Sequence, residues 1–378
     1  YPTISLFPNH RPCIYKFTVW TYNHRHTKRR NMMNKHWKSL AAALALVSVL
    51  GVAGCGGTQT AGSSAKSASA AAADGKTNMR VAYSPSLCEA STVVAYEKGF
   101  FKEEGINPEM INIQGASETE ALGTDKVDGM QTLVSKIIQP IQNGLPVKLT
   151  AGLHTGCVRI VTRPDTGIKD VKGLKGKKIG VSGLADTATV IAQRALHTDG
   201  IGVTPDNMEV EFVVVERNSL PQALKSGQVD AIAMTDPVGA IAMKEYGFTS
   251  VLDTAKSPEF KDEYCCSAIL TAKFVQEHPD LAKGYTRAVM KGALYVSKHP
   301  EEVAQMLHDK NYVSGDVALN AELLKSYNYV PSVQGGYDAI ERAATQLEEI
   351  GIVHDVNAKA LADGAFQRFD GLEDTPSL

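Results

Sequence analysis

The chain has no apolar stretch that is long enough to cross a bilayer as a helix. Its longest such run, residues 40–54, covers 15 residues, whereas a spanning helix needs about 20. The signatures of common catalytic sites are also missing, since no G-x-S-x-G, H-E-x-x-H or G-x-x-x-x-G-K-S/T occurs. These absences predict that the mature chain has no membrane span and favour a binding protein over an enzyme.

The chain also lacks an excess of basic side chains, with 39 Lys and Arg against 41 Asp and Glu. Residues 1–55 contain eight of the basic side chains and no acidic one, which leaves 31 basic and 41 acidic side chains in the rest, a net charge near −10. Phosphate recognition requires clustered Lys and Arg. Nucleic acid is therefore not an expected partner.

The N-terminal segment is typical of a bacterial lipoprotein precursor. Residues 1–31 continue into no later pattern, and we interpret them as translated upstream sequence or a mis-set start. Residues 32–54 have the basic start and apolar run of a signal peptide, and Val52-Ala53-Gly54-Cys55 resembles a lipobox, in which the Cys55 sulfur is acylated. Residues 55–77, rich in Gly, Ser and Ala, are expected to form a flexible tether. The sequence predicts an extracytoplasmic protein anchored to the cell membrane by lipid such as palmitate, although a plain secretory signal with an accidental cysteine is the alternative.

The remaining sequence alternates short β-branched runs with amphipathic helical stretches as far as residue 253, which predicts an α/β fold with mostly parallel sheets. A strand-like run at 267–271 and a largely helical tail follow. The expected strands up to residue 253 are 79–83, 108–113, 129–133, 147–153, 158–162, 178–181, 210–215, 231–234 and 249–253.

An internal repeat divides this region. Glu120-Ala121-Leu122 followed by Val127-Asp128-Gly129 reappears 102 residues later as Gln222-Ala223-Leu224 followed by Val229-Asp230-Ala231. Two tandem lobes of the same architecture explain the repeat. We expect one lobe from residues 78–164 plus 267–378 and the other from 165–266, with crossings near 163–167 and 264–267.

Small molecules bind beyond the carboxyl ends of strands in open α/β sheets, and four predicted loops lie there. We expect ligand contacts from Ser84, Leu87 and Cys88, from His154, Thr155, Gly156 and Cys157, from Ser182, Asp186 and Thr187, and from Thr235 and Asp236. The alternative for Ser84, Asp186, Thr187 and Asp236 is helix capping, and His154 has a purely structural alternative. Asp186 and Asp236 suit a cationic or neutral heterocyclic solute better than an anion.

The cysteines of the folded region are Cys88, Cys157, Cys265 and Cys266, and their spacing matches neither a zinc motif nor a regular disulfide framework. Three interpretations stay open. The cysteines act as small buried hydrophobes, or they form a disulfide such as Cys88 to Cys157 or Cys157 to Cys266, or they line a thiol pocket suited to a soft metal. Cys266 is included among the expected ligand contacts.

The run from Val94 to Asn107 (VAYEKGFFKEEGIN), with GLKGKKIGV at 173–181 and Val229-Asp230-Ala231, resembles the nitrate, sulfonate and taurine substrate-binding family, which also includes binding proteins for thiamine-pyrimidine precursors. The resemblance covers residues 79–350. It implies a two-lobed type II periplasmic-binding fold with the ligand in the cleft between the lobes.

The same resemblance implies a function. The chain would be the monomeric solute-binding subunit of an ABC importer, without a cofactor, that closes on its solute by hinge motion and delivers it to a permease with its ATPase. One alternative is a thiamine-pyrimidine synthase-like enzyme, because Tyr264-Cys265-Cys266-Ser267-Ala268 is similar to the cysteine motif of such enzymes but stops at two cysteines. Another is a solute-sensing lipoprotein.

Overall fold

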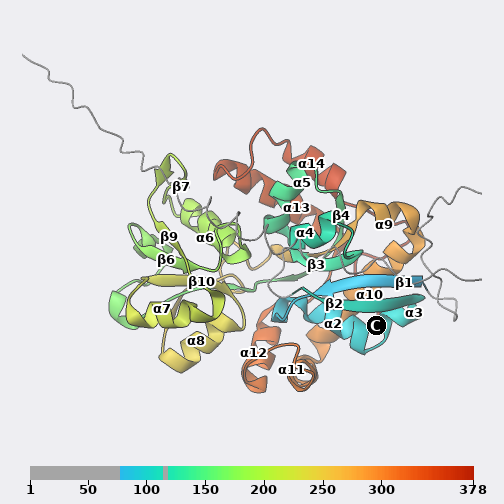
Figure 1. Ribbon diagram of the computed structural model, residues 1–378, viewed down its shortest axis with the longest axis horizontal. Coiled ribbons are helices and arrows are strands. Elements are labelled where there is room, and N and C mark those ends of the chain that lie inside the picture. The colour runs from blue at the N-terminus through green and yellow to red at the C-terminus, as the bar shows by residue number, and fades with distance from the viewer. Residues whose placement is uncertain (1–76, 114–117) are drawn as a thin grey trace, which may run out of the picture. The chain divides into compact units, whose positions relative to one another are not determined.

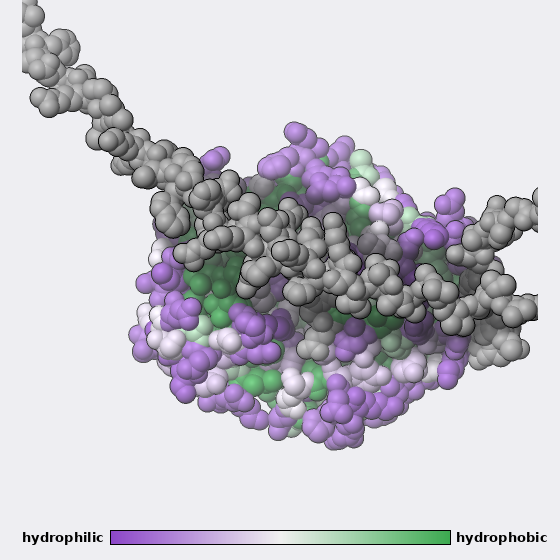
Figure 2. Space-filling view, in the orientation of Figure 1, coloured by the Kyte–Doolittle hydropathy of each residue, from purple (hydrophilic) through white to green (hydrophobic). Residues whose placement is uncertain are grey.

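The computed structural model describes residues 77–113 and 118–378, which belong to one compact unit. The predicted signal peptide, Cys55 and all but the last residue of the predicted tether lie outside the described residues. Within these ranges no helix combines the length and apolar character needed to cross a membrane. On the face drawn in Figure 2, hydrophilic residues cover most of the visible described surface and hydrophobic residues form small patches.

The first sheet has five strands in the order β2-β1-β3-β12-β4 (Figure 1). Strand β1 pairs in parallel with β2 and β3, while β12 is antiparallel to both β3 and β4. The strand bounds are β1 Thr77–Tyr83, β2 Ile106–Asn112, β3 Gly129–Leu133, β4 Val147–Thr155 and β12 Tyr264–Thr271. The helices connecting β1 to β4 include η1 (Leu87–Glu89), α2 (Ala90–Glu97), α3 (Phe100–Glu103), α4 (Glu118–Gly123) and α5 (Val134–Gln142).

The second sheet also has five strands, in the order β11-β5-β10-β6-β9. Strand β6 is parallel to β9 and β10, and β5 is antiparallel to β10 and β11. The bounds are β5 Val158–Thr162, β6 Lys178–Val181, β9 Glu211–Val214, β10 Ala231–Thr235 and β11 Thr249–Asp253, with helices α6 (Thr187–Thr198), η4 (Arg217–Ser219), α7 (Leu220–Ser226) and α8 (Val238–Tyr246). The α/β fold is confirmed, although each sheet is mixed rather than mostly parallel.

The two sheets repeat one another, as the internal repeat predicts. In each, an antiparallel strand separates the last two strands of the repeat: β12 lies between β3 and β4, and β5 lies between β10 and β11. The repeated aspartates make the same bond in both copies. Asp128 Oδ2 accepts the backbone N–H of Arg80 at 2.8 Å, and Asp230 Oδ2 accepts that of Lys178 at 2.9 Å. Each aspartate therefore ties the start of its own strand to the neighbouring parallel strand.

The chain crosses between the lobes twice, and the first crossing is not where we expected it. Strand β5 pairs along both of its edges with strands of the second sheet, β10 and β11. The chain therefore leaves the first sheet at Gly156 and Cys157, not at 163–167. The second crossing covers 254–263, ending where β12 begins. The first lobe therefore comprises 77–155 and 264–378 within the described ranges, and the second comprises 158–253.

The helical tail returns to the first lobe. Helix α10 packs against α2, α3 and β4, and α13 packs against β4 and α5. The tail helices are α9 Ala272–Glu277, α10 Pro279–Lys298, α11 Pro300–Asp309, α12 Val317–Ser326, α13 Val333–Glu349 and α14 Ala358–Ala365. This packing completes the first lobe and brings the segment after α12 close to the crossings.

Candidate functional site: a cleft between two sheets

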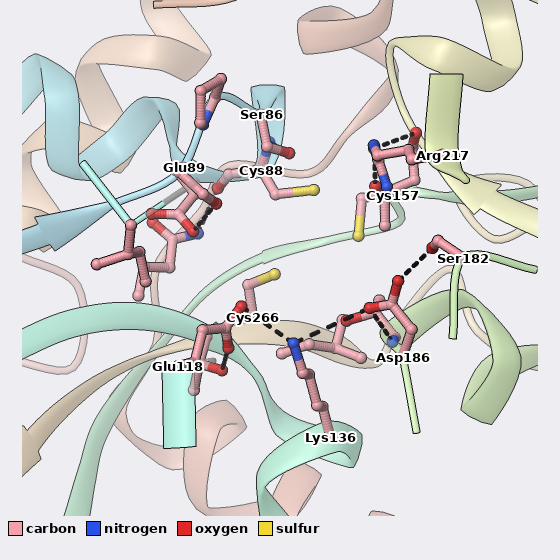
Figure 3. A pocket seen from close by; sticks show the side chains of 18 residues that line it. Ser86, Cys88, Glu89, Glu118, Lys136, Cys157, Ser182, Asp186, Arg217 and Cys266 are labelled. Atoms are coloured by element: carbon pink, nitrogen blue, oxygen red, sulfur yellow. Dashed lines mark hydrogen bonds and ion pairs between the residues drawn. The ribbon is translucent and has the colours of Figure 1, made fainter. Parts of the chain in front are cut away.

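A cleft of about 430 Å³ lies where the carboxyl ends of strands from both sheets face one another (Figure 3). This volume is within the range typical of small-molecule sites. The first lobe contributes residues after β1, at the end of β3 and in β12, and the second contributes residues after β6 and β9 and at the end of β10. Eight of the residues predicted as ligand contacts line the cleft: Ser84, Cys88, Cys157, Ser182, Asp186, Thr187, Thr235 and Cys266.

The other five predicted contacts do not line the cleft. Leu87, His154 and Thr155 are buried inside the first lobe. Gly156 occupies the first crossing with φ of 63°, and a Cβ there would lie 2.4 Å from the Cα of Ala255 in the second crossing. These four residues therefore support the walls and the first crossing rather than facing the cavity.

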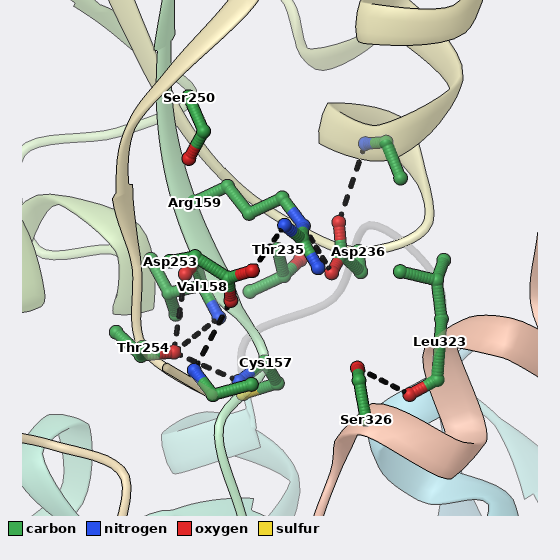
Figure 4. Close-up of polar contacts among 12 residues, drawn as sticks. Cys157, Val158, Arg159, Thr235, Asp236, Ser250, Asp253, Thr254, Leu323 and Ser326 are labelled. Atoms are coloured by element: carbon green, nitrogen blue, oxygen red, sulfur yellow. Dashed lines mark hydrogen bonds and ion pairs between the residues drawn. The ribbon is translucent and has the colours of Figure 1, made fainter. Parts of the chain in front are cut away.

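Asp236, the fifth, is engaged in an internal network (Figure 4). Its carboxylate accepts a bond from Arg159 Nε at 2.8 Å and one from the Tyr327 hydroxyl at 2.9 Å, and it also accepts the Ala240 N–H in the first turn of α8. Arg159 in turn reaches Asp253 at 2.6 Å. The capping alternative thus holds for Asp236, and Tyr327 links it to the other lobe.

Asp186 combines both expected roles. It is the N-cap of α6, with Oδ1 accepting the Thr187 N–H at 2.8 Å, and it lines the cleft, where Oδ2 accepts the Ser182 hydroxyl. Its Oδ1 also lies 3.9 Å from Lys136 Nζ of the first lobe. The carboxylate therefore contributes to a contact across the cleft as well as to a helix cap.

Charged residues that the sequence reasoning missed complete the lining. Lys136 Nζ lies 3.3 Å from Glu118 Oε1, whose other oxygen accepts the Thr132 hydroxyl at 2.7 Å. Across the cleft, Arg217 Nη2 donates to Thr235 Oγ1 at 2.7 Å. Lys136 escaped notice because α5 begins directly after β3, so no loop marks that strand end. The signal that could have identified Lys136 is its position just after the end of a predicted strand.

Glu89, at the end of η1, is a buried carboxyl in the cleft wall, 6% exposed. Its Oε1 accepts the Ser84 hydroxyl at 2.8 Å, and among the described residues its Oε2 has no hydrogen-bond partner. Burial, and then the negative charge of Glu118, raise the pKa of Glu89 to about 8. The side chain is therefore mostly protonated at neutral pH and presents a neutral acid rather than an anion.

The four cysteines of the folded region come together at the base of the cleft as free thiols. The Sγ atoms of Cys88, Cys157 and Cys266 lie within 4.8 Å of one another, and Cys265 Sγ lies 3.4 Å from Cys157 Sγ. Contact with the Cys157 thiol and burial raise the pKa of Cys88, and burial raises that of Cys265. The structure thus contains neither of the disulfides considered above, and Cys88, Cys157 and Cys266 are buried, as the interpretation as small hydrophobes predicts.

His154 lies beside this cluster without facing the cavity. Its ring packs at a tilt against Tyr329, with 4.6 Å between centroids, and Nε2 and Nδ1 lie 3.1 and 3.2 Å from the carbonyl oxygens of Cys88 and Thr155. Burial lowers the pKa of His154, but the Cys266 sulfur and the two carbonyls outweigh it and place the pKa above its ordinary value. The structural alternative for His154 fits this environment.

A buried arginine joins the lobes behind the cleft. Arg194 of α6 is 1% exposed and donates to Ser135 Oγ of α5 at 2.7 Å, to Glu263 of the second crossing at 2.7 Å, and to Gln346 of α13 at 2.6 Å. These bonds fix the second lobe against the first near the crossings.

Comparison with known proteins places the chain in a recognisable group. The family model described as NMT1/THI5 like matches residues 89–303. The chain is 26% identical over 225 residues to a putative aliphatic sulfonates-binding protein of Bacillus subtilis (strain 168), covering 57% of this chain and 65% of that protein, which is slightly less than two thirds of its length. It is 27% identical over 224 residues to a putative thiamine biosynthesis protein of Haemophilus influenzae, covering 57% and 67%.

A third curated relative is an enzyme by name. It is the 4-amino-5-hydroxymethyl-2-methylpyrimidine phosphate synthase of Candida albicans (strain WO-1), 26% identical over 227 residues, covering 54% of this chain and 62% of the enzyme.

Solved structures share the fold. The periplasmic nitrate-binding protein of Synechocystis PCC 6803 superposes with a TM-score of 0.65 at 15% identity, covering 77% of this chain and 86% of that one. The periplasmic aliphatic sulphonate binding protein of Escherichia coli gives 0.62 at 14% identity, covering 80% and 96%. At these identities the likeness establishes the periplasmic-binding fold.

Proposed function

Because this chain belongs to the NMT1/THI5-like family and has a cleft between two α/β lobes, we propose that it is the extracytoplasmic solute-binding subunit of an ABC importer. The observation that carries the proposal is the cleft itself, since its polar lining comes from the strand ends of both lobes. A solute placed there contacts both lobes at once. Such a solute stabilises the closed relation of the lobes over an open one.

The crossings at 156–157 and 254–263 would serve as the hinge. Opening separates Lys136 from Asp186, which lie 3.9 Å apart, and breaks the bond from Tyr327 to Asp236. Both contacts join the first lobe to the second. Their loss on opening and recovery on closure make the two states distinct rather than continuous.

The lining favours a neutral or cationic nitrogen-containing solute, such as a pyrimidine or an amine, over nitrate or a sulfonate. The two cationic side chains among the described lining residues, Lys136 and Arg217, are already engaged by Glu118 and Thr235. Carboxylates at Glu118 and Asp186 accept hydrogen bonds from a donor-rich solute, and a plain anion would meet their repulsion.

The proposed importer role also requires a membrane, a permease and its ATPase. Acylation of Cys55 would hold the chain at the outer face of the membrane, and the tether would let the lobes, as a monomer, reach a permease with its ATPase. These steps fall on residues outside the described ranges and rest on the sequence pattern.

A solute screen followed by scattering tests the proposal. A bound solute at 100 times its dissociation constant adds about 2.7 kcal/mol to the free energy of unfolding, which a thermal-shift assay over pyrimidines, amines, nitrate, bicarbonate and sulfonates detects. Small-angle scattering should then show a smaller radius of gyration with the solute, and an unchanged radius at saturation would count against closure.

Variants separate binding in the cleft from binding elsewhere. Asp186→Asn and Glu118→Gln should reduce the thermal shift, whereas Glu277→Gln, an exposed change on α9, should leave it unchanged. A solute whose shift survives both cleft substitutions binds outside the cleft, and such a result contradicts the proposed function.

A second candidate function is pyrimidine phosphate synthesis, favoured by the Candida relative and by the thiols beside His154. The two-cysteine run at Cys265 and Cys266 departs from the motif of those enzymes. Metal analysis separates the two, because stoichiometric iron in the purified protein is expected only of the enzyme.

A further inference from the structure

Three sulfur atoms meet at the floor of the cleft. Cys88, Cys157 and Cys266 all line the cavity, and their Sγ atoms lie within 4.8 Å of one another. They come from three distant parts of the chain: η1, the first crossing and strand β12. Figure 3 shows the three sulfurs turned toward the same space. The fold thus assembles a set of soft ligands on a surface that opens to the cavity.

The spacing of the sulfurs suits a single ion in trigonal coordination. Three sulfurs at about 2.3 Å from a central ion are separated from one another by about 4.0 Å. Sulfurs at the observed limit of 4.8 Å reach this spacing when each moves by about half an ångström toward the centre.

The backbones of the three cysteines are held by bonds that do not involve the sulfurs. The Cys88 carbonyl accepts from Gln131 and from His154, and the Cys157 N–H donates to Thr254 Oγ1 at 3.0 Å while its carbonyl accepts the Asp236 N–H at 3.0 Å (Figure 4). Cys266 is fixed in the sheet between Leu133 and His154. Such outer contacts orient the ligands of protein metal sites.

A second group, formed by His154, Cys265 and Cys266, also has metal-ligand spacing. His154 Nε2 lies 3.1 Å from the Cys88 carbonyl oxygen, and Nδ1 lies 3.2 Å from that of Thr155 and 3.5 Å from Cys265 Sγ, so a ring nitrogen that bound an ion would give up its contact with a carbonyl. The Cys265 sulfur does not line the cleft. The geometry therefore selects the three sulfurs of the cavity over this second group.

We propose that Cys88, Cys157 and Cys266 form a three-sulfur binding site for one thiophilic metal ion, and that Cu(I) is its preferred occupant. Soft thiolates bind Cu(I), zinc and iron–sulfur clusters, and the number of ligands distinguishes these: three satisfy Cu(I), whereas a closed structural zinc site takes four. Each thiol releases its proton to solvent as its sulfur binds the ion. The site goes beyond the proposed function, because three sulfurs hold an ion whether or not the cleft also takes an organic solute.

The test titrates the full chain, reduced and then kept anaerobic, with Cu(I) in competition with the chromogenic chelator bicinchoninate. We expect one equivalent to be withdrawn from the chelator, and copper-edge X-ray absorption should count three sulfur neighbours at about 2.3 Å. This spectroscopic count needs no variant, so it stands even if a substitution prevents folding.

Single substitutions then assign the ligands. Cys88→Ser, Cys157→Ser and Cys266→Ser should each weaken Cu(I) binding by more than about 100-fold, since loss of an outer-shell partner alone costs 10 to 100-fold. Cys265→Ser is the control, a neighbouring and only partly buried thiol that does not line the cavity, and should change the affinity by less than about threefold.

Several outcomes would overturn the site. They are no withdrawal of Cu(I) from the chelator, zinc or iron bound in preference to Cu(I), fewer or more than three sulfurs in the absorption spectrum, and loss of binding in Cys265→Ser but not in Cys88→Ser. The solute screen on metal-free protein is independent of these results. If Cu(I) does not bind while a solute raises the melting temperature, only the proposed metal site is contradicted. If Cu(I) binds while no solute raises the melting temperature, only the importer role is contradicted.

Discussion

Because of Glu89, the free energy of unfolding of this protein should fall as pH rises, whereas most carboxyl groups in folded proteins act in the opposite direction. Burial raises its pKa from 4.5 to about 8 in the folded chain. Below pH 4.5 the folded and unfolded chains both hold the proton. Between pH 4.5 and 8 only the folded chain holds it, so the unfolded state is favoured increasingly as pH rises.

The size of this change in the free energy of unfolding follows from the binding of one proton to the Glu89 carboxyl. The free energy of unfolding falls by about 1.4 kcal/mol for each pH unit in that interval, which gives at most about 5 kcal/mol by pH 8. Glu89→Gln keeps the shape of the side chain but cannot titrate. The variant should therefore gain stability relative to the wild type as pH rises from 5 to 8.

The assay is urea unfolding followed by circular dichroism at several pH values across this interval. Glu277→Gln, an exposed glutamate on α9, serves as the control and should follow the wild type at every pH. If Glu89→Gln and the wild type lose or gain stability in parallel between pH 5 and 8, the carboxyl titrates at its ordinary pKa and the reasoning from its burial is wrong.

Two further substitutions test the contacts near the crossings. Arg194→Ala should lower the free energy of unfolding by about 3 to 5 kcal/mol, because it removes the buried positive charge that pairs with the buried Glu263 carboxylate. Arg342→Ala removes a half-exposed partner of the same carboxylate and should cost less than about 1 kcal/mol in the same urea titration. Gly156→Ala should cost at least about 2 kcal/mol, because the new Cβ would meet Ala255 and φ is positive. Gly167→Ala, with φ of 72° and no atom within 4 Å, isolates the backbone term, and equal losses in the two glycine variants would show that the crossings are not packed tightly.

The sequence predicted the cleft well where a strand ends in a visible loop. Ser84 and Ser182 follow β1 and β6, Thr235 ends β10, and all three line the cavity because small-molecule sites of α/β sheets lie at the carboxyl ends of strands. It failed where the polar residue belongs to a helix that starts without a loop, as at Lys136. It also failed where a polar residue after a strand turns inward, as Asp236 does toward Arg159.

The amino-acid sequence by itself determined the elements and their repetition. Period-two apolar runs specify strands, and the two copies of the repeat specify two similar sheets, because both patterns depend only on neighbouring residues. The tertiary structure decided which sheet receives β5, since that strand's apolar sequence fits either sheet and only the pairing on both of its edges distinguishes them. It also decided that thiols 69 to 178 residues apart in the chain meet at one point. No local pattern encodes such a meeting, because it arises from packing whole lobes together.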